Sequence, residues 1–227
     1  MTLTADRKDF VDPDTCCHRC VTNGNNRRLS SGVAFFLKHD DGTEHPYGPH
    51  CAAEALGGRD VLKGIPDFTA RDVDQLGGGE SEGSAGGSDG PDPQDVALRD
   101  AAIAKRYLLL RMEKVANIPG INPMVRYQPL ETIYQEFRKT GILHQADVTH
   151  ILAIERKATT PSNLRTNNLL DVYTAETKLT RRIKQSTTPR DKSYLEGIRS
   201  WLRAKLRLSD KQIAAAKIQL HPSAFDN

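Results

Sequence analysis

The chain of 227 residues lacks any apolar run long enough to cross a membrane. No stretch reaches the roughly 18 uninterrupted apolar residues that a transmembrane helix needs. The opening sequence, MTLTADRKDF, also lacks the apolar segment of a secretory signal peptide. We therefore expect a cytoplasmic protein, in a compartment where thiols stay reduced.

Apolar side chains and catalytic motifs are also scarce. Hydrophobic residues make up 37% of the chain and charged residues 27%, which leaves little apolar mass for one large core. The sequence contains no Gly-rich phosphate loop that ends in Gly-Lys-Ser/Thr, and no H-E-x-x-H motif. We therefore expect a protein that is not an enzyme.

All four cysteines lie in two short runs, CCHRC and YGPHC, between Cys16 and Cys51. A C-x2-C pair followed by a distant His-Cys pair has the spacing of a closed tetrahedral Zn²⁺ site. Reduced cysteines crowded together favour metal binding over disulfides. The sequence therefore predicts a structural zinc site.

The predicted zinc ligands are Cys17, Cys20, His50 and Cys51. The fourth ligand stays open, because two adjacent ligands, His50 and Cys51, are sterically awkward. His45 lies on the expected return strand and is one alternative to His50. Cys16 is another, although its C-x3-C spacing is poorer. His18 lies inside the C-x2-C run and is expected to point to solvent.

The residues around these cysteines predict a small mixed fold. Residues 1–14 are polar and are expected to be loose. Val33, Phe35 and Leu37 alternate as in a strand, and the Asp-Asp-Gly-Thr run at 40–43 has turn chemistry, so a β-hairpin is expected. A short helix should follow Gly48-Pro49 and end at Gly57. A C-x2-C turn, a hairpin and a helix that returns a ligand form a treble-clef-like zinc module.

The run Cys17-x2-Cys20 followed by Gly48-Pro49-His50-Cys51 resembles the short zinc-finger modules of phage, plasmid and other mobile-element proteins. The signature of those modules is C-x2-C and then G-P-x-C at the start of a helix. The resemblance covers about 40 of the 227 residues. It implies a structural zinc and a nucleic-acid-associated role.

The charge divides the chain into two halves. Residues 1–95 contain 9 Lys and Arg against 17 Asp and Glu, whereas residues 96–227 contain 23 against 12. A Gly-, Ser- and Asp-rich stretch at 76–95 has no aromatic or β-branched residue and predicts a flexible linker. The predicted organisation is a zinc module at 10–75, the linker at 76–95 and a basic helical domain at 96–225.

The second half predicts an all-helical bundle, so the fold class is mainly α. Ser209 and Gln212 form a capping box before the last helix, with Leu208 and Ile213 as its hydrophobic staple. Trp201 falls on an apolar stripe and is expected in the core. The expected helices are about 96–117, 130–140, 144–157, 161–185, one from 189 and 210–220.

Two groups of cations lie late in the helical half. Spaced cations neutralise phosphates without reading bases, so we expect DNA or RNA as the partner of this domain. The alternative is a protein–protein adaptor of a mobile-element or defence-type complex, in which zinc is purely structural and the acidic zinc module docks a protein. The predicted nucleic-acid contacts are Arg181, Arg182, Lys184, Arg199, Arg203 and Arg207.

Overall fold

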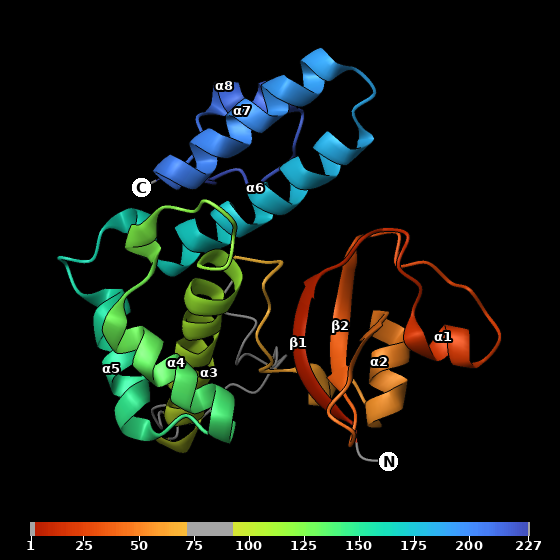
Figure 1. Cartoon of the computed structure of the whole chain (residues 1–227). Coiled ribbons are helices and arrows are strands. Elements are labelled where there is room, and N and C mark those ends of the chain that lie inside the picture. The colour runs from red at the N-terminus through yellow and green to blue at the C-terminus, as the bar shows by residue number, and fades with distance from the viewer. Residues whose placement is uncertain (1–2, 72–92, 227) are drawn as a thin grey trace, which may run out of the picture. The chain divides into compact units, whose positions relative to one another are not determined.

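The computed structural model describes residues 3–71 and 93–226, which divide into two compact units, Met1–Arg106 and Tyr107–Asn227 (Figure 1). The described residues form eight α-helices and one three-stranded antiparallel sheet, so the mainly helical fold class with a small β element is confirmed. Residues 76–92 of the predicted linker lie outside the described residues, and 93–95 begin helix α3. Within 3–71 and 93–226, no helix has the length and apolar character of a membrane span.

The sheet of the first unit has the order β1-β2-β3, with both pairings antiparallel. Strands β2 (Val33–Lys38) and β3 (Glu44–Tyr47) form the expected hairpin, in which Leu37 pairs with His45. Strand β1 (Thr4–Phe10) pairs with β2, so the prediction of a loose N-terminus is wrong for these residues. Its polar side chains form salt bridges and hydrogen bonds with other segments, and a hydropathy pattern does not predict such contacts.

Two of those contacts involve neighbouring residues of β1. Arg7 forms a salt bridge with Glu44 of β3 at 2.6 Å, and its guanidinium lies 4.3 Å from the ring centre of Phe36. Lys8 donates to Asp67 at 2.7 Å. An edge strand of this composition stays in the sheet because both of its cations find an acidic partner on another segment.

Two α-helices, the 3-10 turn η1 (Asp60–Leu62) and the part of α3 (Pro93–Leu109) up to Arg106 complete the first unit. Helix α1 (His18–Thr22) is one turn long, and helix α2 (Pro49–Leu56) begins with a proline at its first position. Gly57 ends α2 with a φ of 82°, in the left-handed region that glycine adopts without strain, which confirms the predicted start and stop of this helix. The small core between sheet and helices consists of Cys17, Leu29, Ala34, Leu37, Tyr47 and Ala52.

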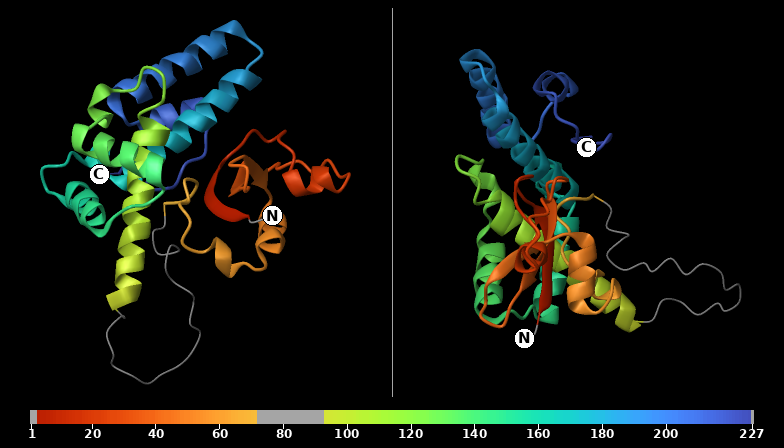
Figure 2. Two further views of the ribbon diagram at one scale, coloured as in Figure 1. Left: turned by 60° about the horizontal axis from the view of Figure 1, so that its bottom comes forward. Right: turned by 90° about the vertical axis from the view of Figure 1, so that its right-hand side faces the viewer.

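All regular elements of the second unit are helical, among the described residues. Its centre is α6, which packs against both α7 and the π-helical turn that continues α3; Figures 1 and 2 show α6 and α7 side by side and running in opposite directions. Its α-helices are α4 (Gln128–Thr140), α5 (Gln145–Arg156), α6 (Thr166–Gln185), α7 (Pro189–Lys205) and α8 (Asp210–Ala216). Its shorter turns are the π-helical turn η3 (Leu110–Val115) and the 3-10 turns η4 (Pro123–Val125) and η5 (Ser162–Leu164). Helix α3, which leads into η3, spans Pro93–Leu109.

The predicted helices of this half are present with shifted ends, since α6 begins at Thr166 and not at 161, and α8 ends at Ala216 and not at 220. The capping box of α8 is present, with the Ser209 hydroxyl accepting from the Gln212 N–H and the Gln212 side chain accepting from the Ser209 N–H. The prediction that Trp201 lies in the core is wrong, because its side chain is 49% exposed. Helix α7 buries Leu195, Ile198 and Leu202, and Trp201 lies about 100° around the helix from Leu202.

Candidate metal centre

Three cysteine sulfurs converge in the first unit. The Sγ atoms of Cys17, Cys20 and Cys51 all lie within 4.8 Å of one another, and those of Cys20 and Cys51 are 3.7 Å apart. Two sulfurs bound to one tetrahedral Zn²⁺ at ~2.3 Å would be about 3.8 Å apart. The spacing of this cysteine group therefore fits a metal ion, and thiolates are ligands that Zn²⁺ favours.

Three different local structures bring the sulfurs together. Cys17 is the residue before α1, Cys20 lies within its single turn, and Cys51 lies in the first turn of α2. The N–H of Gly48, just before α2, donates to the Cys17 sulfur at 3.4 Å. Cys17 is also part of the small core, so the group is continuous with the packing of the unit.

The electrostatics of the cysteine group suit a cation. Burial alone would raise the pKa of Cys17, but the backbone N–H groups of Gly48 and Cys20 and the neighbouring sulfurs outweigh it, so that pKa is lowered. Burial, reinforced by the sulfurs of Cys20 and Cys17, raises the pKa of Cys51 to about 12. The first thiolate thus opposes ionisation of the next, and a divalent ion among the three sulfurs relieves that repulsion.

The structure does not bring His50 into the cysteine group. Its side chain is 72% exposed, and its Nε2 lies 3.5 Å from a carboxylate oxygen of Glu54. Adjacent residues of a helix project about 100° apart, so His50 points away from the sulfurs when Cys51 points toward them. Cys16 also lies outside the group and forms a backbone bridge with Arg28. Among the described residues, the cysteine group contains three ligand atoms.

A second group consists of His18, His39 and His45, whose ring nitrogens also lie within 4.8 Å of one another. His45 belongs to this histidine group and not to the cysteine group. Instead of pointing away from the protein, the His18 ring stacks on His45, with centroids 3.9 Å apart. Burial and then the two neighbouring imidazoles lower the pKa of His18.

Two of the three rings of the histidine group lie within hydrogen-bond distance of a hydroxyl. The Nε2 of His39 lies 3.1 Å from the hydroxyl of Tyr47, and the Nε2 of His45 lies 3.2 Å from that of Thr43. Imidazole nitrogens are ligands for Zn²⁺, Cu²⁺ or Ni²⁺. Sequence reasoning missed this group. The available signal was the hairpin, which folds His39 back toward His45 across the turn.

The structure separates the cations that the sequence grouped for nucleic-acid binding. Arg203 turns inward and pairs with Glu176 of α6, and the two side chains are only 20% and 11% exposed. Helix α7 ends at Lys205, so Arg207 does not continue the row of Arg199 and Arg203 and is exposed beyond the helix. Lys184 is exposed, whereas Arg181, Arg182 and Arg199 are partly buried.

Comparisons with protein-family models, with curated proteins and with solved structures give no match to this chain.

Proposed function

We propose that the protein is a non-enzymatic binding protein that holds single-stranded DNA or RNA on helix α7, with a structural Zn²⁺ in its first unit. The observation that carries the proposal is a pair of exposed aromatic side chains in the most basic part of the chain. Tyr194 and Trp201 are 55% and 49% exposed, although both are large and partly apolar. Exposed aromatic rings flanked by cations are the means by which proteins hold unpaired bases.

The positive charge of the second unit is concentrated around α7. Residues 178–217 contain 12 Lys and Arg against 3 Asp and Glu, whereas residues 107–177 contain 8 against 7. Almost the whole excess of cations therefore belongs to the end of α6, to α7 and to α8. A surface of this kind attracts the phosphates of a nucleic acid independently of its sequence.

One face of α7 combines the cations with the aromatic rings. The face, which we call the α7 stripe, falls within about 80° of the helix circumference at 100° per residue. All five of its residues are exposed, and the Lys205 Nζ lies 5.8 Å from the ring centre of Trp201. The α7 stripe consists of Arg190, Tyr194, Gly197, Trp201 and Lys205.

Gly197 lies between the two aromatic rings, in the middle of a 17-residue helix. Packing does not require a glycine there, because a Cβ at this position would have no atom within 4 Å. A glycine inside a helix lowers stability by about 0.5–1 kcal/mol relative to alanine. The absence of a side chain leaves the helix backbone open between Tyr194 and Trp201, where a flat base can approach.

The α7 stripe supplies two kinds of contact. Aromatic stacking contributes about 1–3 kcal/mol per base and tolerates any sequence. Arg190 and Lys205, at the two ends, would neutralise phosphates on either side of the stacked bases. Because bases in a duplex are already stacked on one another, this surface favours single strands.

The cysteine group supports the remaining part of the proposal. Zn²⁺ bound by Cys17, Cys20 and Cys51 would hold the turn before α1 to the first turn of α2, which is the treble-clef-like arrangement. The resemblance of these residues to zinc-finger modules of mobile-element proteins points the same way. The acidic first unit would then serve a protein partner in the cytoplasm, since its charge opposes contact with nucleic acid.

Fluorescence anisotropy of a labelled 20-nucleotide oligo(dT), measured on the full chain over a range of salt concentrations, tests the proposal. We expect binding that weakens with salt and that exceeds binding to a duplex of equal length. Trp201→Ala should weaken it by about 5- to 150-fold, the equivalent of the loss of one stacked base. Tyr127→Ala, which removes a 45% exposed aromatic ring that precedes α4 and is not part of α7, is the matched control.

Two results would reject the proposal. One is the lack of measurable oligo(dT) binding at low salt. The other is unchanged binding by the double variant Tyr194→Ala/Trp201→Ala. Either result would favour the adaptor function, in which the cations only solubilise the helices.

A further inference from the structure

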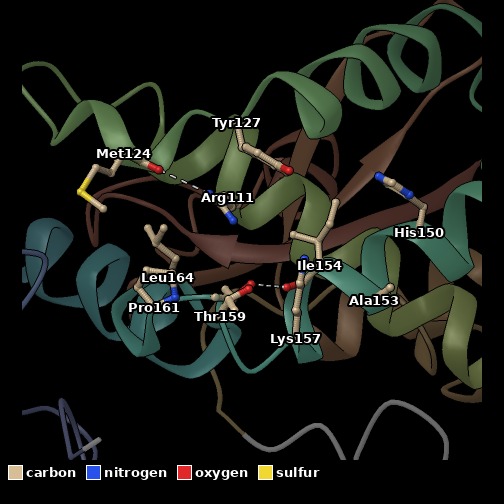
Figure 3. A pocket seen from close by; sticks show the side chains of 11 residues that line it. Arg111, Met124, Tyr127, His150, Ala153, Ile154, Lys157, Thr159, Pro161 and Leu164 are labelled. Atoms are coloured by element: carbon tan, nitrogen blue, oxygen red, sulfur yellow. Dashed lines mark hydrogen bonds between the residues drawn. The ribbon is translucent and has the colours of Figure 1, made fainter.

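The second unit contains a pocket of about 490 Å³, separate from the α7 stripe. Its walls come from the π-helical turn η3, from η4, from α5 and from the segment 157–164 (Figure 3). No residue of α7 lines it, and none of the lining residues is an Asp or a Glu. A pocket of this size accommodates a small organic molecule.

A buried arginine forms part of the pocket wall. Arg111 is 3% exposed, and in Figure 3 its guanidinium lies at the centre of the side chains that line the pocket. Its Nε donates to the Val125 carbonyl at 2.8 Å and its Nη1 to the Tyr107 hydroxyl at 2.7 Å. A third, longer bond of 3.4 Å joins Nη2 to the Met124 carbonyl.

Among the described residues, no carboxylate accepts a hydrogen bond from Arg111, although the rings of Tyr107 and Tyr127 lie 5.9 and 5.8 Å from its guanidinium carbon. All three acceptors are neutral oxygens, and a guanidinium has five N–H groups. Within the described residues, two N–H groups therefore make no hydrogen bond. Glu155 accepts a hydrogen bond from Thr166 at 3.0 Å and makes none with Arg111. A buried cation is unfavourable unless an anion compensates it.

An irregular helical turn places Arg111 at the pocket. Helix α3 continues into the π-helical turn Leu110–Val115, in which the Ala116 N–H donates to the Arg111 carbonyl at 3.0 Å, five residues back. Such turns are rare and occur frequently at functional sites. Here the wide turn coincides with a buried cation that has no hydrogen bond to a carboxylate, which favours a binding role over a purely structural one.

The remaining walls are of two kinds. Lys157 and His150 add a cation and an imidazole, and Tyr127 and Thr159 add hydroxyls. The apolar surface comes from Met124, Ala153, Ile154, Pro161 and Leu164. Together they form a positive, hydrogen-bonding region beside an apolar one.

We propose that this pocket binds a small organic anion, with a carboxylate, sulfonate or phosphate on the free N–H groups of Arg111 and a flat apolar body between Ile154 and Leu164. A planar guanidinium matches such oxyanions with two parallel hydrogen bonds. Lys157 supplies a second positive charge at the same pocket. The ligand is a small molecule and not a nucleic-acid chain, so this binding goes beyond the function proposed for α7.

Two dyes of nearly equal shape and different charge test the proposal on the full chain. 1-Anilinonaphthalene-8-sulfonate is a flat organic anion, and N-phenyl-1-naphthylamine is its uncharged analogue. Fluorescence titration should show one site for the sulfonate, with an affinity at least about tenfold above that of the neutral dye, as expected for one charge-assisted hydrogen bond. An unchanged near-ultraviolet circular dichroism spectrum of the protein shows that its tertiary structure is intact when the dye binds.

Two variants locate the site without removing the hydrogen bonds of Arg111 to Val125 and Tyr107. Ala153→Phe fills the pocket from the exposed side of α5 and should abolish sulfonate binding, whereas Ala158→Phe adds the same ring at an exposed position outside the lining and should leave it unchanged. Lys157→Gln should weaken binding of the sulfonate and not of the neutral dye.

Three results would overturn the proposal. They are equal affinity for the two dyes, sulfonate binding that survives Ala153→Phe, and sulfonate binding that oligo(dT) displaces in competition. The last result would assign the dye to the α7 stripe, and it leaves the nucleic-acid proposal standing.

Discussion

The first unit is organised around sulfur atoms, whereas the second is organised around buried aliphatic side chains. In the first unit the core cluster has six members, one of them a candidate metal ligand. In the second unit α6 alone buries six apolar residues, among them Leu169, Leu170 and Leu179. A small unit with so few apolar contacts needs a further source of stability, such as a bound metal ion. A helical unit of this size can be stable through packing alone.

The largest expected effect is the loss of the metal from the first unit. Cys51→Ser should remove the bound zinc and unfold the first unit, because a structural Zn²⁺ contributes about 10–16 kcal/mol of binding free energy in small zinc modules. The helices of the second unit should melt at an unchanged temperature. Zinc stoichiometry by native mass spectrometry and thermal unfolding by circular dichroism measure the two effects.

Cys16→Ser is the matched control for that variant, because Cys16 lies next to the cysteine group and outside it. It should leave the zinc content at the wild-type value. A Cys51→Ser protein whose first unit stays folded and free of metal would show that the first unit does not depend on a metal for its stability. A Cys16→Ser protein that loses zinc would identify Cys16 as the fourth ligand.

A core substitution in the second unit should give the converse result. Leu179 is fully buried in α6, and Leu179→Ala should lower the free energy of unfolding of this unit by about 2–5 kcal/mol. The zinc content should not change. Urea unfolding followed by circular dichroism gives the value, with Ile142→Ala at a 58% exposed position as the control. Zinc loss on Leu179→Ala would show that the two units are not independent.

The next effect separates structural cations from binding cations within the second unit. Arg203→Ala leaves Glu176 largely buried without its partner and should destabilise the unit by about 1–3 kcal/mol. It should not alter the salt dependence of oligo(dT) binding. Arg190→Ala should do the opposite, with unchanged stability and a slope of log affinity against log salt that is smaller by about 0.7, the value for one phosphate contact on a single strand. Equal slopes for the two variants would remove the distinction.

Sequence patterns predicted the local features whose cause lies within a few residues. The capping box at Ser209, the start of α2 at Pro49 and its end at Gly57 depend on neighbouring groups alone, and all three are present. The hairpin β2–β3 followed in the same way from alternation and turn chemistry. The convergence of the three cysteines was expected from their spacing, because C-x2-C places two sulfurs on one turn.

Two predictions are wrong, the loose residues 4–10 and the buried Trp201, and these and other features that the sequence did not show depend on contacts between distant segments. Strand β1 is held by Glu44 and Asp67, which no local pattern connects to Arg7 and Lys8. The inward turn of Arg203 depends on Glu176, 27 residues earlier in the chain. Trp201 and Leu202 are both apolar, and only the packing of α7 decides which one is buried. The histidine group likewise needs the hairpin and α1 to be in place.

The smallest expected effect tests whether the α7 stripe serves binding at the expense of the fold. Gly197→Ala adds a methyl group with no neighbour within 4 Å and should raise the stability of the second unit by about 0.5–1 kcal/mol. The same methyl group lies between Tyr194 and Trp201 and should weaken oligo(dT) binding by a few fold. Stability and affinity would then move in opposite directions at one residue, as expected where function retains a glycine that the helix does not need. A stabilised variant with unchanged affinity would show that bases do not approach the helix between the two rings.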